Sequence, residues 1–198
     1  MRYINYLLES KSAPLAMPFF LPHKHAPKEM SESVGCLMAA MNIDAPLKDA
    51  RVIVVGDGVK PRTGAVFALF TKAIVHSIDP LMRTALLGLR VEGGGLPNLD
   101  RLSCHTSKGQ DMKINCAGER VLVVLPHSHC PMQDAAEIPY NYSRLDIINL
   151  PCCVAVPDNF LNIVSPPKVY KDPNILSGKN TMYVWEDWGR IRSPRNCS

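Results

Sequence analysis

The feature that most constrains the fold is a strand, a glycine turn, a helix, a second strand and an acid that follow one another along the chain. Residues 51–55, Arg-Val-Ile-Val-Val, are a short β-branched run that predicts a buried parallel strand. Gly56-Asp57-Gly58 ends this strand abruptly, and residues 61–70 predict a helix with a proline in its first turn. Residues 73–78 predict a second strand, which Asp79 closes. The order is that of a βαβ unit, so we expect an α/β fold.

The rest of the chain continues this alternation of elements. Further strands are predicted at 99–105, 121–125 and 146–150, and further helices at 28–42, at 81–89 and through Ala135 and Ala136. Residues 168–170 and 181–185 predict strands that pair antiparallel at the edge of the sheet. The fold class expected is therefore α/β, with a Rossmann-like, mainly parallel sheet that is flanked by helices.

The length of 198 residues fits one domain. We expect a single Rossmann-like domain over residues 1–198, made of three parts. Residues 1–45 form an N-terminal arm, rich in proline, and a helix. Residues 50–155 form the core, and residues 156–198 form a C-terminal edge segment.

Composition limits the compartment and the partners. The net charge of +4 permits an RNA partner without requiring one. The seven cysteines are odd in number and two are adjacent, and the first residues lack the pattern of a secretory signal. We therefore expect free thiols in a reducing compartment, which indicates a cytoplasmic protein. No apolar run is long enough to span a bilayer, so no membrane association is expected.

The glycine turn and Asp79 favour binding of a nucleoside. Glycines after a strand let the backbone approach a ligand closely, and the start of the next helix offers N–H groups and the positive end of a dipole. Asp79 follows Gly56 at about the 20-residue spacing expected of an acid that binds a ribose diol. Arg62 opposes the helix dipole, which suggests an anionic ligand such as a cofactor carboxylate or an acidic partner, and simple exposure of the side chain is the alternative.

The spacing of the glycines indicates which class of cofactor the loop could bind. After Gly56 and Gly58 the next glycine is Gly64, which is too distant for the dinucleotide fingerprint, and the chain has no P-loop. A cofactor without a pyrophosphate suits this loop better, and S-adenosylmethionine is such a cofactor.

Two short motifs carry a resemblance to a known family. Val54-Val55-Gly56-Asp57-Gly58 resembles the first motif of class I S-adenosylmethionine-dependent methyltransferases, and Ile78-Asp79-Pro80 resembles their second, ribose-binding motif. The resemblance covers about residues 50–155 and departs from the family where Val54 and Val55 replace an acid. It implies that the glycine loop and the start of the helix hold the methionine end of the cofactor. The residues expected to bind the cofactor are Gly56, Asp57, Gly58, Arg62, Thr63, Asp79, Pro80 and Pro126.

A loop rich in histidine follows the strand at 121–125. His127 and His129 lie in this loop, and either could act as a general base near the transferred methyl group. The loop and the Cys152-Cys153 pair are loosely similar to those of eukaryotic tRNA ribose methyltransferases, although Pro131 follows Cys130 where they carry glycine. Because carboxyl ends of parallel strands meet at one edge of the sheet, we expect the loop beside the glycine turn.

Other roles for this loop remain open. The ligand types of His127, His129, Cys130 and Cys152 suit zinc, but their spacing is not typical of a zinc site, so no metal is expected. Cys130 could be a nucleophile with a histidine partner. The residues could also simply pack the loop.

The function expected is methyl transfer from S-adenosylmethionine to RNA or to a small molecule. The alternative is a binding or regulatory protein that keeps this fold without catalysis, which the missing acid before the glycine loop favours. The sequence does not name the acceptor.

Overall fold

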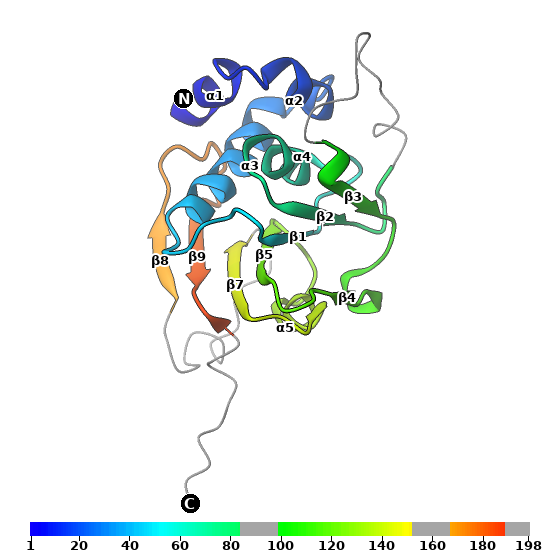
Figure 1. The fold of residues 1–198 in the computed structure, drawn as a ribbon. Coiled ribbons are helices and arrows are strands. Elements are labelled where there is room, and N and C mark those ends of the chain that lie inside the picture. The colour runs from blue at the N-terminus through cyan, green and yellow to red at the C-terminus, as the bar shows by residue number, and fades with distance from the viewer. Residues whose placement is uncertain (84–98, 152–166, 189–198) are drawn as a thin grey trace, which may run out of the picture.

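The structure, a computed structural model, describes residues 1–83, 99–151 and 167–188. One sheet lies between two unequal layers, as Figure 1 shows. Four helices, in two tiers, cover one face, and a short helix with a small two-stranded ribbon covers the other. The expected helix at 81–89, the Cys152-Cys153 pair and the last ten residues fall largely or wholly outside the described residues.

The main sheet has seven strands in the order β3-β2-β1-β5-β7-β9-β8. Five of them are parallel, namely β1 (Arg51–Val55), β2 (Ile74–Ile78), β3 (Leu102–His105), β5 (Arg120–Pro126) and β7 (Arg144–Leu150). Strand β9 (Thr181–Trp185) is antiparallel to β7, and β8 (Lys168–Lys171) is antiparallel to β9. The predicted α/β fold with antiparallel strands near the C-terminus is confirmed. Of the two antiparallel strands only β8 lies at an edge of the sheet, because β9 lies between β7 and β8.

The direction of strand addition reverses between β1 and β5. From β1 the chain passes through α4 (Arg62–Phe70) to β2 and then β3, whereas β5 pairs with the other side of β1. At such a switch point the loops after the two central strands diverge to opposite faces and leave a crevice beyond their carboxyl ends. The topology therefore predicts a ligand site where β1, β2 and β5 end.

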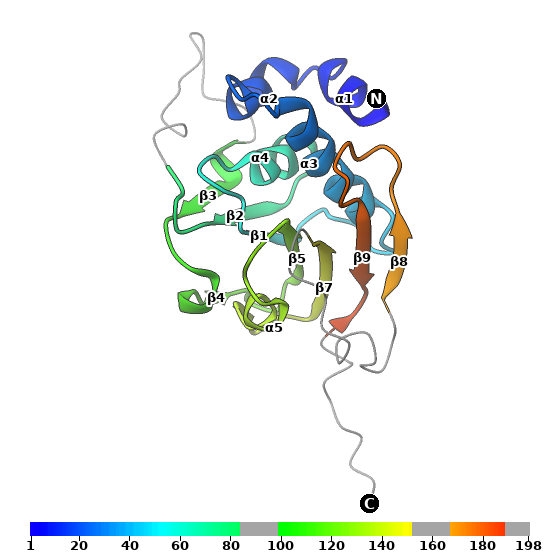
Figure 2. The same ribbon diagram turned by 180° about the vertical axis from the view of Figure 1, so that it is seen from behind.

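The helical layer is formed by α4 and the N-terminal helices. These are α1 (Arg2–Leu8), α2 (Ala13–Phe20) and α3 (Ala26–Met41). Helices α3 and α4 pack against each other and against the sheet, and α1 and α2 lie on top of them (Figures 1 and 2). Helices α1 and α2 contribute Leu7, Phe19 and Phe20 to the main core, all nearly or fully buried.

The opposite face carries a second core. It is covered by α5 (Met132–Ala136) and by the ribbon of β4 (Ile114–Asn115) and β6 (Pro139–Tyr140). Ile53, Val123 and Ile147 point into this core, and Trp185 and Trp188 close it with their rings edge to face. Alternate residues of β1, β5 and β7 thus fill two cores, as expected for strands buried on both faces.

Several predicted elements differ from the structure. The proline-rich part of the arm contains a helix, α2, although Pro18 lies inside it. Pro14 lies in the first turn, where no N–H bond is lost. Residues 99–101 form a single 3-10 turn, η2 (Leu99–Arg101), rather than the start of a strand. Residues 81–83 are not helical, so the expected helix does not begin at Leu81.

None of the helices in the described ranges is both long enough and apolar enough to cross a membrane.

Candidate functional site

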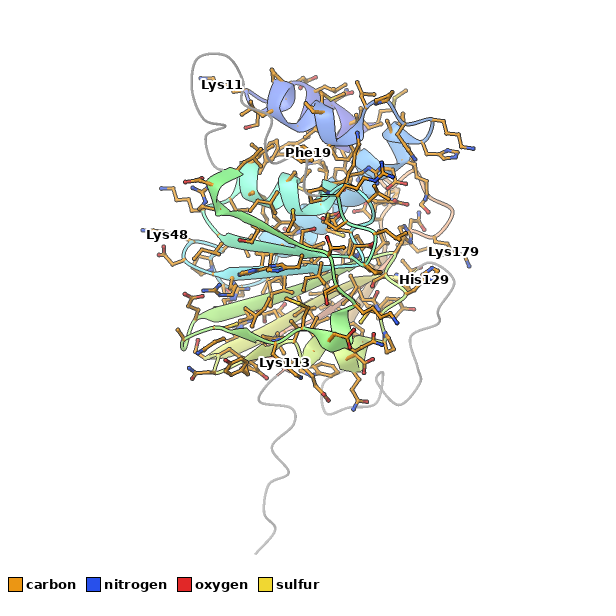
Figure 3. All side chains as sticks on the ribbon, turned by 90° about the vertical axis from the view of Figure 1, so that its right-hand side faces the viewer. Lys11, Phe19, Lys48, Lys113, His129 and Lys179 are labelled. Carbon is orange, nitrogen blue, oxygen red and sulfur yellow. The ribbon has the colours of Figure 1, made fainter. Side chains whose placement is uncertain are left out.

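Two adjoining cavities lie beyond the carboxyl ends of β1, β2 and β5. The larger one, of about 350 Å³, is lined by these strand ends and by the loops that follow β3 and β5. The smaller one, of about 160 Å³, lies between the glycine loop, the start of α4 and the first turns of α3. Gly56 and His127 line both cavities. Figure 3 shows His129 at the opposite end of the sheet from Lys48, which precedes β1, and so locates this edge.

The glycine turn brings two loops into contact. Gly56 has a φ of +79°, and its N–H donates to the carbonyl of Ile78 at 2.8 Å. A Cβ atom at Gly56 would lie 2.5 Å from the hydroxyl oxygen of Ser128, so only glycine fits between this turn and the loop after β5. The close packing places His127 directly beside the glycine turn.

The carboxylate of Asp57 caps the start of α4. It accepts hydrogen bonds from the N–H groups of Thr63 and Gly64, both at 2.8 Å, and from the hydroxyl of Ser77 at 2.7 Å. Burial raises the pKa of Asp57 to about 6, although these hydrogen bonds oppose the shift. The sequence analysis expected free N–H groups at the start of α4. That expectation is wrong for Thr63 and Gly64, because Asp57 uses both.

Asp79 joins the end of β2 to the glycine turn. One carboxylate oxygen accepts a hydrogen bond from the N–H of Gly58 at 2.9 Å, and the other accepts one from the N–H of Leu81 at 2.8 Å. The side chain lines the larger cavity and is half-buried. Since an ionised carboxylate can accept about four hydrogen bonds, Asp79 keeps capacity for two hydroxyl groups of a ligand.

His127 is held by a residue from α3. Its Nε2 lies 2.6 Å from Oε1 of Glu32, and the Nζ of Lys28 lies 3.3 Å from the same oxygen. The backbone of His127 is left-handed, with a φ of +53°, and its N–H donates to the carbonyl of Leu150. Because a carboxylate only accepts, Nε2 carries the hydrogen of this bond. That nitrogen is therefore not available to accept a proton from a substrate.

Three consecutive buried residues connect α3 to other elements, two of them to residues of the site. The hydroxyl of Ser31 accepts the N–H of Leu176 from the loop before β9, and the hydroxyl of Ser33 lies 3.1 Å from that of Thr63. Glu32 lies between them and contacts His127. Each residue ties α3 to a different element, so this helix is part of the wall of the site as well as of the core.

The smaller cavity carries charged groups of both signs. Lys28, Glu29 and Glu32 come from α3, and Arg62 comes from α4. The guanidinium of Arg62 is 3.8 Å from the carboxylate of Glu29, too far for a hydrogen bond, and its side chain is only 13% exposed. Its Nε is buried and meets no acceptor among the described residues. A buried donor of this kind fits an anionic group of a ligand.

The structure places all the residues proposed from the sequence around these cavities. Asp79, Pro80 and His129 line the larger cavity, and Gly56 and His127 line both. Those that line only the smaller cavity are Asp57, Gly58, Arg62, Thr63 and Pro126. The roles assigned to them remain predictions.

The contribution of α3 to the site was not predicted. The apolar positions of the helix indicate where it lies, but they do not identify Lys28, Glu29 and Glu32 as lining residues. No pattern in the sequence marks Glu32 as a lining residue, because Lys28 and Glu29 precede it by one helical turn and its burial is visible only in the structure. Lys108, Gly109 and Gln110 in the larger cavity were not predicted either.

Within the described ranges no three side chains of metal-binding type are grouped to hold an ion. Cys130 lines the larger cavity, and burial raises the pKa of its thiol to about 11, which disfavours the thiolate that a nucleophile requires.

Neither a protein-family model nor a curated protein matches the chain. Among solved structures the chain is similar to MtNAS in complex with MTA and tNA, with 16% identity over 93% of this chain and 68% of that chain and a TM-score of 0.49. It is also similar to an S-adenosylmethionine-dependent O-methyltransferase from Thermotoga maritima, with 10% identity over 77% of this chain and a TM-score of 0.47. A third is a cyclopropane-fatty-acyl-phospholipid synthase-like protein from Lactobacillus casei, with 15% identity over 71% of this chain and a TM-score of 0.42. The chain spans 64% and 57% of the lengths of the latter two.

Proposed function

We propose that the protein binds S-adenosylmethionine across the two adjoining cavities and transfers its methyl group to RNA or to a small molecule. The observation that carries this proposal is the position of Asp79. Its carboxylate is fixed by the glycine turn at the end of β2 and lines a cavity of about 350 Å³ at the switch point of the sheet. That volume lies within the range of small-molecule sites, about 300–1,000 Å³.

The residues present fit the cofactor at both ends. Asp79 has acceptor capacity for the two ribose hydroxyl groups. The charged groups of the smaller cavity suit the methionine end, and the buried Nε of Arg62 calls for an anion. When bound, the cofactor supplies an electrophilic methyl group. The chain itself has to orient the acceptor, exclude water and take up a proton.

His129 is the better candidate for the proton acceptor. It is exposed and lines the larger cavity, and Nε2 of His127, the other candidate, donates to Glu32. The bound cofactor would supply the methyl group, and His129 would take up the proton that the acceptor atom releases.

Titration calorimetry with S-adenosylmethionine and S-adenosylhomocysteine tests the proposal. We expect binding by the wild type and a loss of at least about tenfold in affinity for Asp79→Asn, because a charged acceptor for the ribose is removed. Glu119→Gln is the control, since Glu119 pairs with Arg51 at the opposite end of β1. Absence of both heat and thermal stabilisation with either ligand in the wild type would rule the proposal out.

The second candidate is a binding protein without catalysis. Val54 and Val55 replace the acid that the family carries before the glycine loop, and one of the two candidate bases is engaged by Glu32. Incubation with methyl-labelled S-adenosylmethionine and pools of RNA or metabolites distinguishes the two. Labelled product that disappears in His129→Gln supports the enzyme. Binding without product from any pool supports the second candidate.

RNA as the acceptor and a cytoplasmic, reducing location are part of the proposal. The net charge of +4 permits the first without requiring it. The second is supported by Cys36, Cys104, Cys116 and Cys130, which are free thiols in the described ranges. Transfer of label to RNA, and its loss on ribonuclease treatment, tests the acceptor.

A further inference from the structure

Three cations lie beside the cavities, on loops beyond the carboxyl ends of the strands. Lys24 lies in the loop before α3, Arg83 in the segment after β2, and Lys108 in the loop after β3, where it lines the larger cavity. All three residues are exposed. Among the described residues no carboxylate lies within ion-pair distance of any of them. We call Lys24, Arg83 and Lys108 the cationic rim of the site.

Hydrogen bonds hold two of these loops beside the turn that follows β1. The ammonium of Lys60 donates to the carbonyl of Leu21 at 2.8 Å, and Lys24 lies three residues further along that loop. The N–H of Arg83 donates to the carbonyl of Val59 at 2.9 Å. Because Val59 and Lys60 are consecutive, the loops that carry Lys24 and Arg83 meet at the same turn.

The third loop is joined to the second. The hydroxyl of Thr106 donates to the carbonyl of Met82 at 3.0 Å, and Lys108 follows two residues later. Lys108 and Leu81 line the same cavity. The cations of the rim therefore lie on adjoining segments and present one surface to a partner.

The acids that line the two cavities already have partners within the protein. Asp57 and Asp79 accept hydrogen bonds from backbone N–H groups. Glu29 lies 3.8 Å from Arg62, and Glu32 pairs with Lys28 and His127. In the loops of the rim themselves, residues 21–25, 80–83 and 106–111, the exposed acid is Asp111, against three exposed cations. The rim is therefore positive and favours a partner with several negative charges.

Aromatic and apolar groups lie among these cations. His23 and His25 flank Lys24, both are exposed, and their rings lie edge to face at 5.7 Å. Leu81 precedes Arg83 by two residues and is 68% exposed. Rings and apolar groups beside cations suit a single-stranded nucleic acid, because its bases stack on them while its phosphates meet the charges. An acidic peptide would use only the charges.

We propose that the cationic rim, together with the rings of His23 and His25, binds single-stranded RNA. The inference rests on the proposed function and specifies RNA rather than a small molecule as the acceptor. Phosphates of the strand contact the rim, and bases stack on the two imidazole rings. Lys108 both belongs to the rim and lines the larger cavity, so a strand held there reaches the cavity that His129 lines.

Fluorescence anisotropy with a labelled oligouridylate on the full chain tests the surface. The double variant Lys24→Gln, Arg83→Gln should bind at least about tenfold more weakly than the wild type, because two charged contacts to phosphate are removed. The matched control is Lys48→Gln, Lys72→Gln, which removes the same charge from exposed positions before β1 and β2. It should stay within about twofold of the wild type. Equal losses in both variants would overturn the inference, since net charge alone would then explain binding.

The salt dependence of binding counts the phosphate contacts. For a single strand, each contact contributes about 0.7 to the slope of log affinity against log salt concentration, so the rim variant should have a slope smaller by about 1.4. The control variant should keep the slope of the wild type. A rim variant with an unchanged slope would show that Lys24 and Arg83 do not contact phosphate.

Two further probes test the kind of partner. Duplex RNA should bind more weakly than the single strand, because its paired bases cannot stack on His23 and His25. Equal binding of the two would contradict the role of these rings. Vesicles that contain phosphatidylserine test a lipid surface instead. Vesicle binding that the rim variant loses, without RNA binding by the wild type, would overturn the inference in favour of a membrane.

Calorimetry with S-adenosylhomocysteine distinguishes failure of this inference from failure of the proposed function. The rim variant should bind this ligand within about twofold of the wild type, since Lys24 and Arg83 line neither cavity. If the wild type bound S-adenosylhomocysteine but no RNA, the inference would be wrong and a small molecule would remain as the acceptor. If it bound RNA through the rim but no S-adenosylhomocysteine, the RNA surface would stand without the proposed function.

Discussion

Asp57 shows how one carboxylate can replace the usual helix cap. The residue at the cap position of α4 is Pro61, which has no side chain that can accept a hydrogen bond, and Asp57 reaches the N–H groups from four residues earlier. Resemblance to a family motif suggested a ligand contact for Asp57. Its three hydrogen bonds within the protein show that it also holds the glycine turn against α4 and β2.

Asp57→Asn should lower the free energy of unfolding by about 2 kcal/mol. The side-chain NH₂ of asparagine would replace a carboxylate oxygen that now accepts a hydrogen bond, and so would face a buried donor. Denaturant unfolding of both proteins measures the difference. Asp100→Asn, at an exposed position, should leave stability nearly unchanged. A value for Asp57→Asn as small as that of Asp100→Asn would show that the cap does not contribute to stability.

His76 belongs to a polar row across the first three strands. Arg51 donates to its Nε2 at 2.8 Å, so Nδ1 carries the hydrogen and donates to Nε2 of His105 at 3.0 Å. Burial, followed by the charges of Arg51 and His105, lowers the pKa of His76 to about 4. The folded protein therefore holds this ring neutral at a pH where the unfolded chain protonates it.

Because His76 takes up a proton more readily when unfolded, it should make the protein less stable as the pH falls from about 6.5 to about 4. We expect the effect to be about 1–2 kcal/mol, since solvent screens the exposed part of the ring. Urea unfolding across this range should show a smaller loss for His76→Gln than for the wild type. Asp57 acts in the opposite direction, but it is common to both proteins and cancels in the difference.

His23→Gln, at an exposed site on the loop before α3, provides the control and should follow the wild-type curve. Parallel curves for His76→Gln and the wild type would contradict the pKa shift.

At the scale of elements, the site depends on the contact between the loops after β1 and β5. Both glycines of the first loop have a φ of +79°, but their surroundings differ. A Cβ atom at Gly56 would lie 2.9 Å from the backbone Cα of Ser128, whereas at Gly58 the nearest heavy atom is a flexible arginine nitrogen at 3.7 Å. Alanine substitutions at Gly56 and Gly58 therefore distinguish the free-energy cost of a left-handed backbone from that of steric crowding.

Gly58→Ala should cost about 1–2 kcal/mol of stability, the usual penalty of a left-handed alanine. Gly56→Ala should cost about 1–3 kcal/mol more, because it also overpacks the junction. The measurement is denaturant unfolding of both variants, with S-adenosylhomocysteine affinity as a second readout. Equal costs would mean that the loop after β5 moves aside freely.

The strands were the elements that sequence predicted best. Continuous β-branched runs such as residues 51–55 and 121–125 can be buried on both faces only in a parallel sheet, so pattern alone locates β1 and β5. Helix α2 was not predicted, because prolines at 14 and 18 disfavour a helix locally. It forms because Phe19 and Phe20 are buried in the main core.

At the scale of the whole molecule, the N-terminal helices belong to the main core. Leu7, Phe19 and Phe20 are buried together with Phe67 of α4, and Lys60 donates to the carbonyls of Pro18 and Leu21. The arm expected from the sequence is therefore a structural layer. Since it supports α3, which carries Glu32, disturbance of the arm should reach the site.

Phe20→Ala should lower the free energy of unfolding by about 3–5 kcal/mol, because a fully buried ring is removed. At about 2–4 °C per kcal/mol for a chain of this size, the melting temperature should fall by about 6–20 °C. The neighbouring Leu21→Ala is the control, as this side chain is 47% exposed. A separate early transition, with the main one unchanged, would show that the arm unfolds independently.

By itself, the sequence determined the α/β class, the glycine turn and the acid that follows it, because these depend on local periodicity and on spacing along the chain. Gly56 and Asp79 could be identified because the βαβ unit joins neighbouring segments. Only the tertiary structure decided what surrounds them. Glu32 meets His127 from 95 residues away, and Nε of Arg62 is buried beside Glu29 of α3 with no acceptor among the described residues. Such contacts arise from the packing of distant elements, which no local pattern encodes.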